Sequence, residues 1–255
     1  HVGVGGFHRS HQAYYIDQLI ALGNHNHWGI CGVGLLPSDQ KMHEALTEQD
    51  YLYTLIQKDK DLYSAQLIGS IIDYIHAPST PDIFHERLVN PATKIVSLTI
   101  TEGGYCFDDV TQEFITTHPD IQHDLTTSST PKTIFGYIFN ALKERRANSI
   151  EPFTIMSCDN IQTNGDVAKK VFTHFATLKD KNLANWMAEH VCFPNSMVDR
   201  ITPETTDEDR LSLEEKTQLS DQWPVVTEPF VQWVLEDSFS NGRPEFEKTN
   251  IILTK

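Results

Sequence analysis

The sequence predicts an α/β fold in which a mostly parallel sheet is flanked by helices. Strand-like apolar runs alternate with amphipathic helical segments along most of the chain, a pattern typical of parallel sheets with helical crossovers. The clearest strands are "KIVSLTI" at 94–100 and "FTIMSC" at 153–158. With 255 residues, of which 39% are hydrophobic, the chain is long enough to bury a substantial core.

In the first part of the chain the sequence predicts a helix, a strand, a second helix and a hairpin. Residues 9–22 repeat apolar side chains at helical spacing up to a glycine, which predicts a helix with a glycine stop. The run "WGICGVG" at 28–34 indicates a buried strand, and Ser38 is placed to cap the next helix. Two β-rich runs at 51–57 and 62–75, joined by "KDKD", predict a hairpin.

Cap signals mark the helices of the second part. Thr80 followed by Pro81 predicts one helix start, and Thr130 followed by Pro131 predicts another. A further helix is expected over 165–178. The polar, acidic stretch at 202–216 is expected to form a solvated loop and a surface helix.

Charge and composition exclude several classes of function. The net charge is −15, so neither nucleic acid nor an anionic membrane surface is an expected partner. No apolar run approaches the roughly 18–20 residues of a membrane span. The cysteines are widely spaced and lack a C-x-x-C pair, which favours free thiols in a reducing cytoplasm. The histidines have no carboxylate spaced to complete a metal site, so no metal is expected.

A glycine turn opens the chain in "HVGVGGFHRSH". Gly3 and Gly5 occupy the first two positions of a G-x-G-x-x-G pattern, His8 occupies the third, and Gly6 adds a further small residue. Such a turn lets backbone N–H groups approach a pyrophosphate at a helix N-terminus, and Arg9 would add a contact to phosphate. An ordinary glycine-rich strand end is the alternative. The cofactor-binding candidates here are Val2, Gly3, Val4, Gly5, Gly6, Phe7, His8 and Arg9.

Two polar residues near strand ends are the catalytic candidates. Asn160 follows the strand at 153–158, where its amide would donate to a reacting oxygen; the alternative is a cap of the next loop. Asp199 would orient a hydroxyl or a catalytic ammonium group; the alternative is a salt bridge with Arg200. Asp39, after the second strand, is a candidate for the ribose 2′-hydroxyl, or it stabilises its own helix dipole.

Seven motifs occur in an order that closely resembles the mannitol dehydrogenase family of polyol-specific long-chain dehydrogenases and reductases. They are "GVGGFHRSHQAYYID", "WGICGVGLL", "EQDYLYTL", "IVSLTITEGGY", "SCDNIQTNGD", "FPNSMVDRITP" and "PVVTEPFVQWVLED". The resemblance covers essentially all 255 residues. It implies a Rossmann-like N-terminal dinucleotide-binding domain, a helical C-terminal domain, a substrate cleft between them, and metal-independent hydride transfer between NAD and a polyol or ketose.

The resemblance also implies residue roles. It places Asn160 and Asp199 in the active site, and it places Glu102, in "TITEGGY", on a loop that lines the nicotinamide site; otherwise Glu102 is a loop carboxylate facing water. The family's catalytic lysine lies in a Lys-x4-Asn-x2-His pattern that this sequence lacks. Lys143 has the first spacing, but Glu151 stands where the histidine belongs.

These observations define the expectation for the whole chain. Residues 1–255 are expected to form the nucleotide-binding domain, clipped in its first strand, without the helical domain and inactive alone. The full protein is expected to be a monomer or weak homo-oligomer that interconverts a polyol and a ketose of the mannitol and fructose type. A reductase of sugar-acid ketones such as fructuronate, and a nucleotide-binding fragment without catalysis, are the alternatives.

Overall fold

Two pairs of parallel strands form the centre of the fold. In the computed structural model, which describes residues 1–108, 110–111, 113–127 and 130–255, one pair is β1 (Ile30–Gly34) with β4 (Ile71–His76). The other pair is β5 (Ile95–Leu98) with β8 (Thr154–Ser157). All four strands are rich in β-branched or other apolar side chains and lie largely in the interior, as expected for strands covered on both faces.

Val2 joins the two strand pairs into one parallel sheet. It forms parallel bridges with Val33 of β1 and with Leu98 of β5. The order across the sheet is therefore β4, β1, the segment around Val2, β5 and β8. The first strand segment thus occupies the middle of the sheet, and the glycine turn that follows it emerges at the carboxyl edge, where α/β sheets bind ligands.

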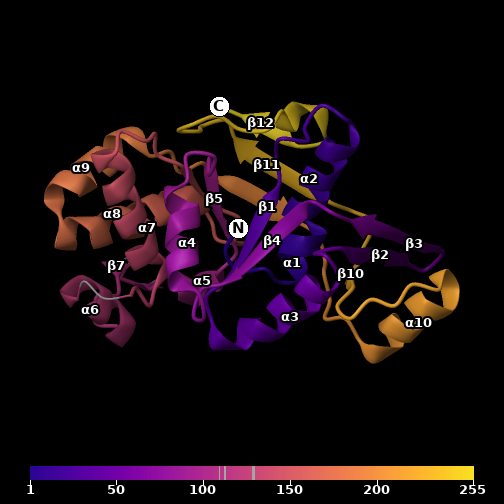
Figure 1. Ribbon diagram of the computed structural model, residues 1–255. Helices are drawn as coiled ribbons and strands as arrows, with labels where there is room; N and C mark the ends of the chain where they lie inside the picture. Colours follow the sequence, from indigo (N-terminus) through magenta and orange to yellow (C-terminus); the bar gives the residue numbers. More distant parts are fainter. Residues whose placement is uncertain (109, 112, 128–129) are drawn as a thin grey trace.

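Helices pack around this sheet (Figure 1). α4, α7, α8 and α9 pack against one another in sequence and gather on the left of the view, while α3 lies below the sheet, against β4. The helices of the sheet layers are α1 (Gly6–Ser10), α2 (Gln12–Ala21), α3 (Gln40–Glu48), α4 (Pro81–Val89), α7 (Ile134–Ala147), α8 (Asn164–Lys179) and α9 (Lys181–His190). The shorter or outlying helices are η1 (Pro37–Asp39), α5 (Thr101–Gly104), α6 (Pro119–Thr126), α10 (Asp207–Thr217) and η2 (Phe246–Lys248).

Smaller sheets lie outside the central one. The hairpin of β2 (Tyr53–Asp59) and β3 (Leu62–Ile68) pairs through β2 with the parallel strand β10 (Val225–Thr227). A third sheet has the order β12, β11, β9, and a two-stranded ribbon is formed by β6 and β7. The bounds of these strands are β9 (Ser196–Asp199), β11 (Gln232–Glu236), β12 (Ile252–Thr254), β6 (Phe107–Asp108) and β7 (Glu113–Phe114).

The main core lies between the sheet and the helices of the second half. Phe135 of α7 packs against Phe172 and Phe175 of α8, with ring centroids 4.7 and 5.8 Å apart. Burying aromatic rings of this size contributes much of the hydrophobic stabilisation of a domain. This core anchors β5 and β8, two of the strands whose ends carry residues of the candidate site.

The α/β class, the parallel sheet and its flanking helices are confirmed, with four local differences. The helix expected over 9–22 is broken at His11, so α1 and α2 are separate. The run at 62–75 is divided around Gly69, and its halves β3 and β4 enter different sheets. Asp39, not Ser38, takes the N-cap position of α3. The helix expected to start at Thr130 begins after Thr133, whose hydroxyl accepts from the Gly136 N–H at 3.3 Å.

The structure confirms two helix predictions that rested on local sequence patterns. Pro81 occupies the first turn of α4, with Thr80 at the N-cap, and α10 forms the exposed helix expected within 202–216. No helix in the part of the chain that the structure describes is long and apolar enough to cross a membrane.

Candidate functional site

Gly3 and Gly5 of the opening turn lack a side chain for different structural reasons. Gly3 has φ +91°, and a Cβ there would lie 2.1 Å from the Thr99 carbonyl oxygen, so the fold itself requires glycine. Gly5 has φ −105° and ψ −171°, an extended backbone that any residue adopts, and a Cβ there would meet nothing within 4 Å. The lack of a side chain at Gly5 therefore serves no internal packing and leaves open space beside the turn.

That open space belongs to a cleft of about 500 Å³ at the carboxyl edge of the sheet. Three walls surround it: the glycine turn with the start of α1, the turn after β5, and the ends of β8 and β9. Its lining residues are Gly3, Gly5, Gly6, Phe7, His8, Thr99, Thr101, Glu102, Cys158, Asp159, Asn160, Val198, Asp199 and Arg200. The first N–H groups of a helix have no partner within the helix, and the start of α1 lies at this cleft.

The cleft brings together residues that are distant in the sequence. Glu102 lies in α5, Asn160 follows β8, and Asp199 ends β9, yet all three line this one cleft. Each is exposed. Among the residues that the structure describes, none of the three side chains makes an ion pair or a side-chain hydrogen bond. Their oxygens, and the amide of Asn160, are therefore free to meet a bound hydroxyl or carbonyl group.

Asp199 and Arg200 do not form the salt bridge that was the alternative for this pair. The Arg200 guanidinium is buried, lies 4.8 Å from the centre of the Tyr14 ring, and donates to the carbonyl oxygens of Ser10 and Glu228. Burial lowers the pKa of Arg200 below its usual range. Because its positive end is turned into the protein, Arg200 leaves the carboxylate of Asp199 unpaired in the cleft.

Arg9 lies outside the cleft, so the structure gives no support to its expected contact with phosphate, which stays a prediction. Its side chain is 1% exposed and is not among the residues that line the cleft. The guanidinium donates to the carbonyl oxygen of Trp223 and lies 5.2 Å from the centre of the Tyr53 ring. Tyr53 in turn donates to the Arg9 carbonyl oxygen at 2.6 Å. Arg9 thus ties α1 to the sheet of β2 and β10, because these partners lie on the inner side of the helix.

His8 lines the cleft as a buried, neutral side chain. Its ring stacks on that of His1, with centroids 3.4 Å apart, and its Nδ1 lies 3.3 Å from the Gln12 side-chain oxygen. Desolvation lowers the pKa of His8 well below its usual range. Within the described residues, no group of three or more His, Cys, Asp or Glu is arranged to hold a metal ion.

The other nucleotide-binding candidates lie in the central strand and after β1. Val2 and Val4 are buried in the core, and Phe7 lies at the cleft. Asp39 lies in η1, outside the cleft lining, and its Oδ2 accepts from the Leu36 N–H at 2.9 Å. It therefore holds the turn of η1, while a contact with ribose and the alternative, an interaction with its own helix dipole, both stay predictions.

The sequence interpretation missed the residue that connects the walls of the cleft. Asp159, at the cleft floor, accepts from the backbone N–H groups of Ile100 and Thr101 at 3.1 and 2.9 Å. Burial raises the pKa of its carboxyl, while the hydrogen bonds that it accepts oppose the shift. The available signal was an acidic residue directly beside Asn160 after a buried strand, but only the fold shows what it contacts.

Comparison with known proteins places this geometry in a family. Residues 1–248 match the family model described as "Mannitol dehydrogenase Rossmann domain". Mannitol 2-dehydrogenase of Aspergillus fumigatus is 49% identical over 257 aligned positions, which cover 100% of this chain and 51% of that protein. The corresponding protein of Pyricularia oryzae is 46% identical, with the same coverage.

Solved structures agree with the sequence relatives. A ternary complex of Pseudomonas fluorescens mannitol 2-dehydrogenase with NAD and D-mannitol superposes with a TM-score of 0.97 at 52% identity, covering 100% of this chain and 52% of that one. A substrate-free D-sorbitol dehydrogenase gives 0.95 at 40% identity, covering 100% and 53%. The chain thus spans about half the length of these relatives. By its sequence, its fold and the position of its cleft, it belongs to the mannitol dehydrogenase family and forms the Rossmann domain of that family.

Proposed function

We propose that this chain is the NAD-binding domain of a polyol dehydrogenase that oxidises the 2-position of a mannitol-type polyol to a ketose and catalyses the reverse reduction. The observation that carries the proposal is the cleft in which the glycine turn meets Glu102, Asn160 and Asp199. The name and ligands of the Pseudomonas fluorescens complex, at 52% identity over the whole chain, support the same assignment.

The residues of the glycine turn fit a dinucleotide. The open space at Gly5 and the first N–H groups of α1 provide an uncrowded set of donors for a pyrophosphate. NAD, when bound, supplies the acceptor of the hydride from the substrate carbon. The side chain of Glu102 lies on the opposite wall of the same cleft and is proposed to contact the nicotinamide side.

The polar residues of the far wall are proposed to hold the substrate. The amide of Asn160 donates to the reacting oxygen and stabilises the negative charge that develops there. The carboxylate of Asp199 accepts from a neighbouring polyol hydroxyl and so orients the carbon chain. Lys143, which has half of the family's lysine spacing, lies in α7 and does not line the cleft. We therefore propose that the base for the hydroxyl proton comes from the other half of the longer protein.

Charge in the cleft favours a neutral polyol over a sugar acid. Glu102 and Asp199 are unpaired carboxylates, and the lining cation, Arg200, is directed inward. An anionic substrate such as fructuronate would need a cation to offset this field. A reductase for sugar-acid ketones is thus the less favoured candidate, and its cation would have to come from outside the described cleft.

The test uses the full-length protein with NAD and a substrate panel. D-mannitol and D-sorbitol are compared in the oxidative direction, and D-fructose and fructuronate in the reductive direction, by absorbance of NADH. We expect mannitol and fructose to give the highest kcat/KM. A higher kcat/KM with fructuronate would replace the proposal by the sugar-acid alternative, and NADH binding without turnover of any substrate would favour a binding module.

A further inference from the structure

The turn that carries Glu102 has a backbone that is costly to maintain. Thr101 has φ +61°, in the left-handed region that β-branched residues avoid, and Cys106 at the other end of the turn has φ +47°. Such a conformation persists only where surrounding contacts hold it. The contacts that hold this turn therefore decide where Glu102 lies in the cleft.

A single buried carboxylate supplies several of these contacts. Asp159 Oδ1 accepts from the Thr101 N–H at 2.9 Å, and Oδ2 accepts from the Ile100 N–H at 3.1 Å. Oδ2 also accepts from the Tyr105 hydroxyl at 2.7 Å. Three donors from one turn thus converge on one carboxylate. The Tyr105 hydroxyl further bonds the Ser157 side chain at 2.6 Å, and both residues are fully buried.

The backbone of the same residue is fixed to the strand that carries Asp199. The buried amide of Asn164 donates to the Asp159 carbonyl oxygen at 3.0 Å and to the Ser196 carbonyl oxygen at 2.8 Å. Asn164 Oδ1 accepts from the Ser196 N–H at 2.9 Å. Ser196 is the first residue of β9, and Asp199 is the last. The side chain and the main chain of Asp159 therefore reach two different walls of the cleft.

We infer that Asp159 is the positioning residue of the cleft, which fixes the turn of Glu102 relative to Asn160. Among the described residues Asp159 makes no hydrogen bond to the glycine turn, which has its own contact, since the Thr99 hydroxyl donates to the Gly3 carbonyl oxygen at 2.7 Å. The effect on turnover rests on the function proposed above. The effect on the order of the turn does not.

Asp159→Asn in the full-length protein is the primary test. An asparagine has one carbonyl oxygen, and its NH2 group cannot accept a hydrogen bond. This NH2 group would face either the Thr101 N–H or the two donors that now bond Oδ2, so the turn must move to avoid facing donors. We expect kcat with D-mannitol to fall at least about tenfold, since small misplacements of reacting groups cost that much or more. The dissociation constant of NADH should stay within about threefold of the wild-type value, because the Thr99 contact is untouched.

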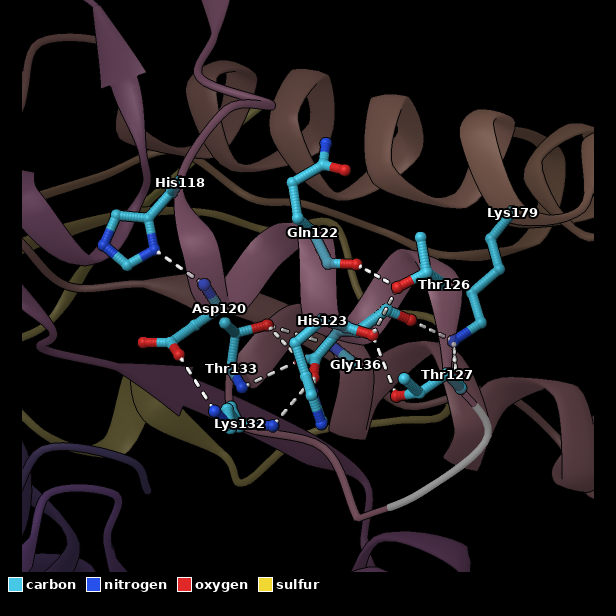
Figure 2. Close-up of polar contacts among 11 residues, drawn as sticks. His118, Asp120, Gln122, His123, Thr126, Thr127, Lys132, Thr133, Gly136 and Lys179 are labelled. Carbon is cyan, nitrogen blue, oxygen red and sulfur yellow. Dashed lines mark hydrogen bonds and ion pairs between the residues drawn. The ribbon is translucent and has the colours of Figure 1, made fainter.

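Asp124→Asn is the matched control for a purely structural role. Asp124 is likewise buried and accepts from two backbone N–H groups, those of Lys132 and Thr133, each at 2.9 Å. It also accepts from the Thr133 hydroxyl at 2.7 Å and pairs with His123 at 2.9 Å. Figure 2 shows Lys132, Thr133 and Gly136 gathered at the start of α7, and none of the three lines the cleft. We expect this variant to lose stability and keep its kcat.

Hydrogen exchange provides a readout that needs no activity. Asp159→Asn should increase amide exchange in a peptide covering 99–105, while Asp124→Asn should increase it near 131–136 only. Unchanged exchange at 99–105 would overturn the inference, as would a fall in kcat no larger than that of the control. A wild-type protein that oxidises no polyol would overturn the proposed function, and the exchange measurement would still decide the role of Asp159.

Tyr105→Phe keeps the test decisive when Asp159→Asn does not fold. The ring stays in its buried place, and only the hydroxyl that contacts Asp159 and Ser157 is lost. We expect kcat to fall about threefold or more, with NADH affinity unchanged. A wild-type kcat in this variant, together with wild-type exchange at 99–105, would overturn the inference.

Discussion

Asp199 and Arg200 are adjacent in the sequence and line the same cleft, but their charged groups have opposite surroundings. Asp199 is exposed in the cleft, whereas the Arg200 guanidinium is buried and bonded to the carbonyl oxygens of Ser10 and Glu228. The alternation of side chains at the end of β9 produces this difference, since successive residues of a strand point to opposite faces. It separates a residue proposed for substrate binding from one that holds the fold.

Variants of this pair should therefore separate activity from stability. Asp199→Asn is expected to lower kcat/KM for mannitol about tenfold with an unchanged melting temperature, because the carboxylate has no internal partner. Arg200→Met is expected to cost about 3 kcal/mol of unfolding free energy, because buried carbonyl oxygens lose a charged donor. Denaturant unfolding and steady-state kinetics measure the two effects. Destabilisation by Asp199→Asn as large as that by Arg200→Met would contradict this assignment.

Variants of Gly5 and Gly3 should separate cofactor binding from stability. Gly5→Val should leave the melting temperature near wild type and weaken NADH binding about tenfold or more, because the side chain fills the space proposed for the pyrophosphate. Gly3→Ala should destabilise the protein by at least about 2 kcal/mol, because φ is +91° and Thr99 blocks the Cβ. Fluorescence titration with NADH checks the first effect. Wild-type affinity in Gly5→Val would make this turn structural only.

Asn160→Ala should lower turnover far more than cofactor affinity. An amide that stabilises charge on the reacting oxygen acts mainly in the transition state, and losing it costs about 3 kcal/mol, or about a hundredfold in kcat. The side chain is exposed and makes no hydrogen bond or ion pair among the described residues, so the melting temperature should not change. If NADH binding collapses while turnover stays near wild type, Asn160 contacts the cofactor instead.

Asp39 predicts a preference for NAD over NADP. A carboxylate after β1 would repel a 2′-phosphate, and no basic residue stands immediately beside it. Asp39→Asn keeps an acceptor for the Leu36 N–H and removes the charge, so catalytic efficiency with NADP should rise about tenfold. Equal efficiency of the wild-type protein with both cofactors would refute the role of Asp39.

The burial of His11 predicts that the protein loses folding stability in mild acid. Its Nε2 lies 2.8 Å from the Gln232 carbonyl oxygen, and burial lowers the pKa of His11 to about 4. The unfolded chain, with a histidine pKa near 6.5, binds the proton first, so this residue's contribution is complete above about pH 6.5. It is lost as the pH falls from there toward 4, by up to about 3 kcal/mol.

Melting temperatures measured from pH 7.5 to 4.5 test this contribution. His11→Gln keeps a donor for Gln232 without a titrating group in this range, so its melting temperature should fall less steeply with acidification than that of the wild type. His8, whose pKa burial also lowers, stays present in both proteins and cancels in the comparison. Parallel curves for the two proteins would show that His11 does not contribute.

The sequence by itself determined the framework and the edge at which the site lies. Apolar runs alternating with helical segments specify a parallel sheet, and parallel strands place their carboxyl ends at one edge. Glu102 and Asn160 follow β5 and β8, and both line the cleft at this edge, while their roles stay predictions. The glycine turn was recognisable from the spacing of its glycines alone, although the contact of Gly3 with Thr99 is decided by the fold.

Only the tertiary structure decided where long side chains point and where elements break. Arg9 and Arg200 both follow residues of the site, yet their partners, Trp223 and Ser10, are about two hundred residues away in the sequence. Asp159 likewise acquires its role from a turn that is remote along the chain. Local patterns specify backbone conformation and burial periodicity, whereas the direction of a buried charged side chain depends on which distant carbonyl or amide group the fold brings beside it.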